Sequence, residues 1–310
     1  MPSRTSEPTA MSAVLKWVAA VVGLAVVAVA AYLFYDIRSM TVVRVTDDLH
    51  MIRGLGGNVA VLKTGAGTVI VDTMTFAMQG SRIRHIAEAL TGESIVLIIN
   101  THYHSDHTHG NPGFLPGTQV VSTTRTLEHL HDIDGSYWTG DAAALLPNHT
   151  FDHDLEIQLG TKHIELLHPG RGHTDGDLVV VFADDATLHT GDLFFNRLYP
   201  NVDLEAGGSV REWGDTLDKV LALEFTHVIP GHGELSDRGG LVQFQRFMRQ
   251  LAAVGANAKA HGLTLDATIR TAQLTEDAGY SPIEIPLVMA LNRDFVIRRS
   301  WEEATGAPRP

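Results

Sequence analysis

The sequence predicts a mixed α/β (α+β) fold in which layered β-sheets are covered by helices. Runs rich in β-branched residues, separated by glycine-containing turns, follow one another from residue 41 onwards. Strands and helical patterns alternate later in the chain, and beyond about residue 239 only helical patterns are found. With 310 residues, 44% of them hydrophobic, the chain can bury the core of one large domain.

The first elements of this fold are predicted between residues 41 and 100. Residues 41–54 (TVVRVTDDLHMIRG) predict two short strands joined by a turn, and residues 56–73 predict a hairpin with a glycine-containing turn. Residues 80–90 place their apolar side chains on one helical face. The continuous apolar run SIVLIIN, residues 94–100, predicts a buried strand.

The later elements follow from the same two periodicities. Apolar or alternating runs predict further strands, at residues 118–122, 154–159, 162–168, 177–183, 186–190 and 226–230. A helix is predicted at 211–223. Further along, an apolar stripe at helical spacing is expected to pack into the core, and it consists of Leu241, Phe244, Phe247, Met248 and Leu251. Residues 37–238 are therefore expected to form one domain, with a helical extension over 239–310.

The N-terminal segment predicts a membrane anchor. Residues 17–34 (WVAAVVGLAVVAVAAYLF) carry no charge, and eighteen helical residues span about 27 Å, close to the hydrocarbon core of a bilayer. We expect residues 1–11 to be disordered and residues 12–36 to form a transmembrane helix that holds the body at the membrane, on the extracytoplasmic (periplasmic) side. A cleaved signal segment, leaving a secreted body, is the alternative.

Composition excludes several kinds of site and disfavours one kind of partner. The chain has no cysteine, so disulfides, thiolate metal ligands and a cysteine nucleophile are absent. A transition-metal site would have to use imidazole and carboxylate. The formal net charge of −13 repels polyanions, so no nucleic-acid partner is expected. Protein partners are not indicated.

A dense polar cluster follows the predicted strand 94–100. It reads THYHSDHTHGN from Thr101. His102 and His104 are two residues apart in extended chain, so both imidazoles can point to the same side and reach one metal ion. Asp106 and His107 follow in a turn and would point to a second position nearby. A solvated polar loop is the alternative for this stretch taken alone.

Other polar residues end apolar segments in the same way. They are Asp72 after VIV, His173 in PGRGH, Asp192 after TLHTG and His232 in VIPGHG. Glycines beside three of them let the backbone turn sharply and approach an ion closely. Five imidazoles and two carboxylates, without Asp72, exceed one tetrahedral site and suit two metal ions that share a carboxylate.

These motifs, in this order, resemble those of the metallo-β-lactamase-fold hydrolase superfamily, and the likeness runs from about residue 45 to 235. The resemblance implies a four-layer αββα sandwich with the site at one edge. It also implies that His102, His104 and His173 hold a first zinc ion, that Asp106, His107 and His232 hold a second, and that Asp192 bridges them. Asp72 is implied to support the site without binding metal.

Several residues of this chain differ from the motifs of particular branches of the superfamily and so exclude or disfavour those branches. The β-lactamases of the superfamily use Cys or Ser near the second zinc, whereas this chain has Asp192 and no cysteine. The di-iron relatives have Glu where this chain has His104, which favours zinc, with manganese or iron left open. The segment from 192 to 232 has no room for the domain inserted in the nucleic-acid-cleaving branch. The branches that remain are the glyoxalase II-like thioesterases, the lactonases and a broad group of other hydrolases. The sequence looks most like that last group and is similar to the zinc hydrolases associated with quinoprotein systems.

The expected activity is hydrolysis of a small-molecule ester, thioester, lactone or amide. A hydroxide bridging two zinc ions would attack the carbonyl, with Asp106 as catalytic proton acceptor. A β-lactamase is the alternative, and a catalytically inactive binding protein is a third reading. Phe195, Arg197 and Tyr199 follow Asp192 on a loop and are candidates for the substrate pocket, and Asp203 lies further along the same loop. The remaining histidines are expected to lie outside the metal ligands. His109 is close to the ligands but is not expected to bind metal, and His129 and His189 are expected to be ordinary surface or edge residues.

Overall fold

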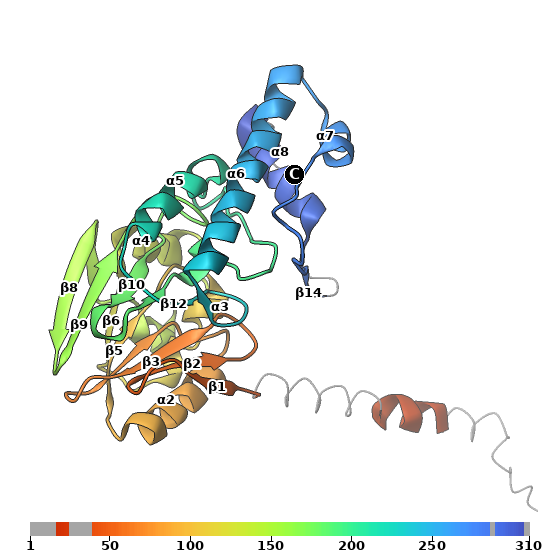
Figure 1. Ribbon diagram of the computed structural model, residues 1–310. Coiled ribbons are helices and arrows are strands. Elements are labelled where there is room, and N and C mark those ends of the chain that lie inside the picture. The colour runs from red at the N-terminus through yellow and green to blue at the C-terminus, as the bar shows by residue number, and fades with distance from the viewer. Residues whose placement is uncertain (1–16, 25–38, 286–288, 307–310) are drawn as a thin grey trace, which may run out of the picture. The chain divides into compact units, whose positions relative to one another are not determined.

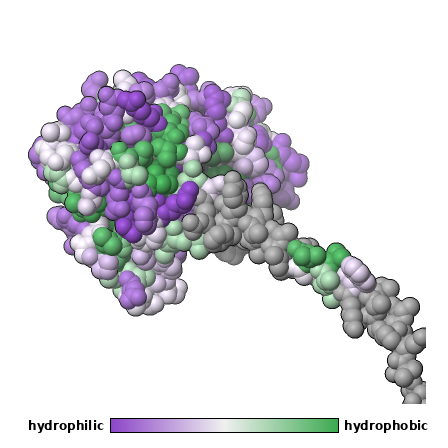
Figure 2. All heavy atoms as spheres, turned by 90° about the horizontal axis from the view of Figure 1, so that it is seen from below, coloured by the Kyte–Doolittle hydropathy of each residue, from purple (hydrophilic) through white to green (hydrophobic). Residues whose placement is uncertain are grey.

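The computed structural model describes residues 17–24, 39–285 and 289–306. Contacts divide the chain into two units, Met1–Ser39 and Met40–Pro310. In the first unit residues 17–24 are helical, and Figure 2 shows their apolar side chains uncovered. None of the helices in the described ranges is long and apolar enough to cross a bilayer. The rest of the expected anchor, residues 12–16 and 25–36, and the expected disordered segment 1–11 lie outside the described residues.

The second unit contains two large sheets. The first sheet has seven strands in sequence order: β1 Thr41–Arg44, β2 Leu49–Arg53, β3 Val59–Lys63, β4 Thr68–Val71, β5 Ile95–Ile99, β6 Gln119–Thr123 and β7 His149–Phe151. The second sheet has the order β13-β12-β11-β10-β9-β8. Its strands are β8 Asp154–Leu159, β9 Lys162–Leu167, β10 Val179–Phe182, β11 Thr187–His189, β12 His227–Ile229 and β13 Ser236–Asp237.

The two sheets face each other, and helices cover their outer faces (Figure 1). Alternation along β3 shows why: Ala60 and Leu62 pack between the sheets against β9 and β10, whereas Val59 and Val61 pack outward with α2, Ala77–Thr91. On the far side the second sheet packs against α5, Val210–Leu221, and α6, Arg238–His261. The mixed α/β prediction is confirmed, and the layers follow the expected order helix, sheet, sheet, helix.

The C-terminal segment is partly different from its prediction. It contains α6, α7 Leu265–Thr271 and α8 Arg293–Thr305, but also an antiparallel hairpin of β14 Ile283–Ile285 and β15 Met289–Leu291. The expectation of helices alone after residue 239 is therefore wrong. Three-residue strands are too short to produce a period-two signal. The helix α4, Thr124–Asp132, which begins with a Thr123 cap, was also missed.

The helix α6 belongs to the core of the sandwich. Its apolar stripe is fully buried with Trp213 of α5 and residues of the second sheet, and consists of Leu241, Phe244, Phe247, Met248 and Leu251. The expectation that this stripe packs inward is confirmed. The segment after residue 238 therefore contributes directly to the stability of the layer that carries Asp192 and His232.

Truncating one side chain of this stripe should measure that contribution. We expect Phe247→Ala to lower the free energy of unfolding by about 3–5 kcal/mol, because it opens a cavity among fully buried side chains. Urea denaturation checks the value, and Arg246→Ala, one residue earlier and exposed, is the control. Equal stability of the two variants would contradict the assignment of α6 to the core.

Candidate metal centre

The candidate site lies where strands of both sheets end. Asp72 follows β4 and the histidine-rich stretch follows β5, and these two strands are parallel neighbours in the first sheet. Asp192 follows β11 and His232 follows β12, which are parallel neighbours in the second sheet. The carboxyl ends of parallel neighbours meet at one sheet edge, and a hydrogen bond from Asn58 N to Gly231 O (2.8 Å) joins the two edges. Residues distant in sequence therefore converge there.

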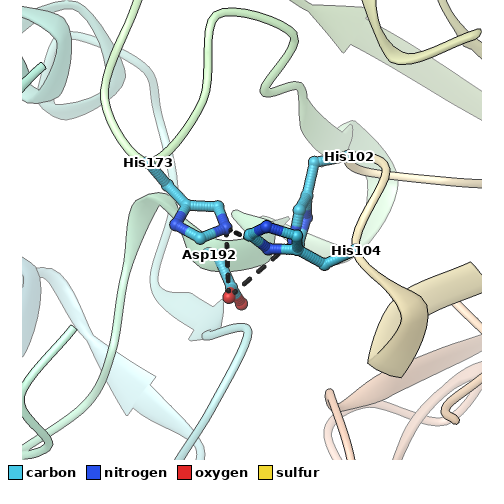
Figure 3. Close-up of side chains that lie close together, drawn as sticks. All are labelled: His102, His104, His173 and Asp192. Carbon is cyan, nitrogen blue, oxygen red and sulfur yellow. Dashed lines mark hydrogen bonds and ion pairs between the residues drawn. The ribbon is translucent and has the colours of Figure 1, made fainter. Parts of the chain in front are cut away.

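A first group of donor atoms contains His102, His104, His173 and Asp192 (Figure 3). One donor atom from each lies within 4.8 Å of all the others. His104 Nδ1 is 2.8 Å from His173 Nε2. Asp192 Oδ2 is 3.6 Å from His173 Nε2 and 3.8 Å from His102 Nε2. This spacing of imidazole nitrogens around a carboxylate oxygen is suited to holding one metal ion.

A second group contains Asp106, His107 and His232. Asp106 and His107 are carried by α3, Ser105–Thr108. His232 Nε2 lies 3.2 Å from Asp106 Oδ2 and 3.4 Å from His107 Nε2. Asp192 Oδ1 is 3.1 Å from His107 Nε2 and 3.4 Å from His232 Nε2. The carboxylate of Asp192 thus presents one oxygen to each group.

Glycines allow the close approach of backbone and side chains at this site. A Cβ on Gly57 would lie 2.2 Å from the ring of His107, and a Cβ on Gly231 would lie 2.0 Å from Asp192 Oδ1. The glycine before His232 is therefore required by the space that Asp192 occupies. This close approach agrees with the role predicted for the glycines in VIPGHG.

Asp72 supports the candidate site through hydrogen bonds. Its carboxylate accepts hydrogen bonds from Thr101 N (2.8 Å) and Thr101 Oγ1 (2.7 Å), and from His107 Nδ1 (2.7 Å). Because Nδ1 of His107 is engaged in this way, its Nε2 faces the second group. Asp72 is fully buried and does not belong to either group of donor atoms. It therefore lies where the resemblance implied that a supporting residue would be.

The histidines of the first group are in a state that suits metal binding. His102 Nε2 is buried and has no hydrogen-bond partner among the described residues, although it points toward Asp192. Burial, reinforced by neighbouring imidazoles, holds the pKa of His102 well below its usual range and lowers that of His173 to about 4. These two imidazoles are therefore neutral at pH 7 and able to bind a metal ion.

In the second group, nearby carboxylates raise the pKa values of the histidines. Burial alone would lower the pKa of His232, but Asp192 and Asp106 outweigh it and raise the pKa to about 9. The same carboxylates, with Asp72, raise the pKa of His107 despite its burial. Without metal, these imidazoles are protonated at pH 7 and must lose protons when an ion binds.

This difference predicts which ion is lost first on acidification. Between pH 8 and pH 6 the second group should lose affinity for Zn²⁺ by about tenfold per pH unit for each proton displaced, whereas His102 and His173 displace none. Zinc competition titrations at the two pH values check this, together with proton release measured calorimetrically in buffers of different ionisation enthalpy. Preferential weakening of the first group would contradict the assignment.

Three other histidines have defined structural partners. His109 donates to Asp134 Oδ2 (2.7 Å), outside both donor groups, as expected. His129 is buried and donates to Asp175 Oδ1 (2.6 Å). The expectation that His129 and His189 are ordinary surface or edge residues is wrong. His189 is fully buried, and its Nδ1 accepts a hydrogen bond from Gly191 N (3.2 Å), so it holds the turn that carries Asp192.

The loop after Asp192 divides into two parts. The ring of Phe195 is buried and stacks on His232 at a centroid distance of 5.0 Å, so it lies directly against the site. Tyr199 turns toward the C-terminal segment, where its hydroxyl donates to Asp277 Oδ2 (3.0 Å). Arg197 is exposed, with φ of 57°. A pocket role for Arg197 and Tyr199 remains a prediction.

One supporting residue was placed in the wrong role by the sequence. Asp203 was grouped with the pocket loop, yet its Oδ2 accepts hydrogen bonds from His104 Nε2 (2.9 Å) and Tyr103 OH (2.5 Å). It is therefore a partner of a donor-group histidine. No spacing rule connects residues 99 positions apart, so only the fold reveals the contact.

Comparison with known proteins identifies the class. Residues 52–232 match the Metallo-beta-lactamase superfamily, and the chain belongs to that family. It is 27% identical over 188 residues to a metallo-beta-lactamase type 2 of Bacillus cereus, covering 60% of this chain and 70% of that protein. It is 29% identical over 198 residues to a hydroxyacylglutathione hydrolase of Rhodospirillum rubrum, covering 60% and 66%.

A solved structure shows the same fold. The metallo-beta-lactamase from Pontibacter korlensis has a TM-score of 0.58 at 18% identity, and the likeness covers 68% of this chain and 99% of that one. The relatives thus include both a metallo-beta-lactamase and a hydroxyacylglutathione hydrolase by name. The fold and the site together define the class of metal-dependent hydrolases. The chain contains a cluster of histidine and aspartate residues that is able to bind metal.

Proposed function

We propose that the protein is a di-zinc hydrolase that acts on the carbonyl group of a small ester, thioester, lactone or amide. The observation that carries this proposal is Asp192, whose two carboxylate oxygens face two separate groups of donor atoms. His102, His104 and His173 would hold one ion and Asp106, His107 and His232 the other, with Asp192 shared. Imidazole and carboxylate donors suit zinc, and they also accept manganese or iron.

The protein's own residues orient the reaction around this centre. Zinc ions bound there would supply Lewis acidity and water of lowered pKa. Asp106 is the one carboxylate of the two groups with substantial exposure, 33% of its side chain, so it can receive a proton from the attacking water. Asp192 is almost fully buried and fixed between the groups, which suits it to holding the centre together. Phe195 excludes solvent on the side of His232.

A β-lactamase is the second candidate, because the relative from Bacillus cereus bears that name. Against it stands the composition of the second group, which contains no cysteine. The hydroxyacylglutathione hydrolase of Rhodospirillum rubrum supports the thioester reading. We favour the glyoxalase II-like and quinoprotein-associated branch for these reasons.

A hydrolase panel distinguishes the two candidates. The purified full-length chain is assayed on lactones, thioesters, simple esters, amides and the β-lactam nitrocefin, with chelator and with added zinc. We expect chelator-sensitive turnover of a carbonyl substrate that exceeds turnover of nitrocefin. Preferred hydrolysis of nitrocefin would favour the β-lactamase, and no turnover of any substrate by zinc-loaded protein would contradict the hydrolase.

We also propose that residues 12–36 hold the catalytic body at the extracytoplasmic face of a membrane. The support is the uncharged stretch 17–34 in the sequence. Membrane fractions washed with alkaline carbonate should retain the full-length chain and release a chain lacking residues 1–36. Equal release of both would contradict the anchor.

A further inference from the structure

We propose that the C-terminal helix α8 sets the metal affinity of the first group by clamping the loop 201–209, which positions His104 and His173. Asp203 acts in this clamp as a positioning residue. The inference rests on the proposed function insofar as the first group binds metal. It concerns residues of the C-terminal segment that touch no donor atom of either group.

Asp203 fixes the orientation of the His104 ring. Asp203 is buried, and its Oδ2 accepts hydrogen bonds from His104 Nε2 (2.9 Å) and from Tyr103 OH (2.5 Å). Its Oδ1 is fixed by the backbone N–H groups of Glu205 (3.1 Å) and Ala206 (3.0 Å). With Nε2 engaged, Nδ1 of His104 faces the first group in a fixed ring orientation.

The loop 201–209 also fixes the position of His173. His173 Nδ1 donates to Asn201 O (3.0 Å), and Asp203 N donates to His173 O (3.0 Å). The contact is tight, because a Cβ on Gly208 would lie 2.3 Å from His173 O. The loop 201–209 therefore fixes both the ring and the backbone of His173, and a shift of the loop would move two of the three histidines of the first group together.

Two side chains of α8 bind the loop 201–209. Arg299 Nε donates to Val202 O (2.8 Å), and its guanidinium also pairs with Glu205 and with Glu302. Glu303 receives hydrogen bonds from Ser209 Oγ (2.5 Å) and Arg211 N (3.1 Å). These two side chains of α8 hold the loop near both of its ends. The Arg299 side chain is only 12% exposed, so the surrounding protein restricts its geometry.

These contacts predict a specific energetic consequence. A metal site gains affinity when its ligands are already oriented before the ion binds. Removing Asp203 frees the His104 ring, and removing Arg299 frees the loop that carries Asp203 and the Asn201 carbonyl. Both changes should weaken zinc binding by the first group, although neither removes a donor atom. Arg298, the neighbouring exposed residue of α8, provides a matched control for Arg299.

The test is zinc affinity, measured by competition with a chromophoric chelator. It is done in the full-length chain and in full-length His232→Ala protein, where the first group remains complete. Asp203→Asn keeps the side-chain size but places an N–H group against His104, and it should weaken first-group zinc binding by about 10–100-fold. Arg299→Ala should weaken it to a smaller degree. Asp134→Asn, which alters the same kind of bond at His109, and Arg298→Ala should leave it unchanged.

The outcomes separate this proposal from a merely structural role and from the proposed function. Thermal unfolding of the chelator-treated variants reports stability independently of affinity. First-group affinities of Asp203→Asn and Arg299→Ala equal to those of their controls would overturn the proposal, even if the variants melt earlier. If Asp203→Asn does not fold, the comparison of Arg299→Ala with Arg298→Ala decides. A wild-type chain that binds no zinc would instead overturn the proposed metal centre.

Discussion

Asp192→Ala is expected to abolish hydrolysis, lowering kcat/KM by about a thousandfold or more, because it removes the carboxylate between the two groups and the electrostatic stabilisation that depends on them. The buried side chain lies within 3.1–3.8 Å of donor nitrogens of four histidines. Without it, the imidazoles of His107 and His232 also lose the principal charge that raises their pKa values. Zinc stoichiometry should fall together with activity.

The measurement pairs steady-state kinetics on the best substrate of the panel with metal analysis after dialysis. Asp215→Ala is the control, since Asp215 is an exposed carboxylate on α5. It should retain both activity and zinc. Activity of Asp192→Ala within tenfold of the wild type would show that the two groups do not act through a shared carboxylate.

Gly231→Ala should produce the second-largest loss, without removing any donor atom. The added Cβ would lie 2.0 Å from Asp192 Oδ1 and 2.7 Å from Gly191 O. Either Asp192 must rotate or the backbone that carries His232 must move, and a displacement near 1 Å can cost about a hundredfold in rate. Kinetics and zinc affinity should therefore both decline.

Gly239→Ala is the matched control for this glycine. Its added Cβ would meet only Asp237 Oδ1, at 3.2 Å, and the change lies in the first turn of α6, where alanine favours the helix. We expect wild-type activity. Full activity of Gly231→Ala would mean that the site tolerates a shift of Asp192 or His232 and would weaken the geometric account.

The strands and the donor residues were predictable from local sequence. The two β-rich runs in 56–73 and the continuous apolar run 94–100 located β3, β4 and β5, because strands that are buried on both faces have nearly continuous apolar sequences. Asp72 and the histidines from His102 onwards follow directly at strand ends, where the fold brings polar residues together. The grouping around Asp192 required the family resemblance in addition.

Contacts that support the donor residues could not be predicted in the same way. Asp203 meets His104 across 99 residues, and Arg299 meets Val202 across 97. His189 was misplaced because its position at the end of β11 gave no sign that the turn of Asp192 would fold over it. Such contacts depend on how the loops and the C-terminal helices pack against one another, and the periodicity within one segment does not report that packing.

The most direct measurement of the central claim is the number of zinc ions bound per chain together with the activity that they restore. Metal-free full-length protein is titrated with Zn²⁺ at pH 8 and assayed after each addition on a substrate from the panel. We expect two equivalents of zinc per chain, with hydrolysis restored by the titration and lost again with chelator. Binding of less than one equivalent, or hydrolysis that persists in metal-free protein, would contradict it.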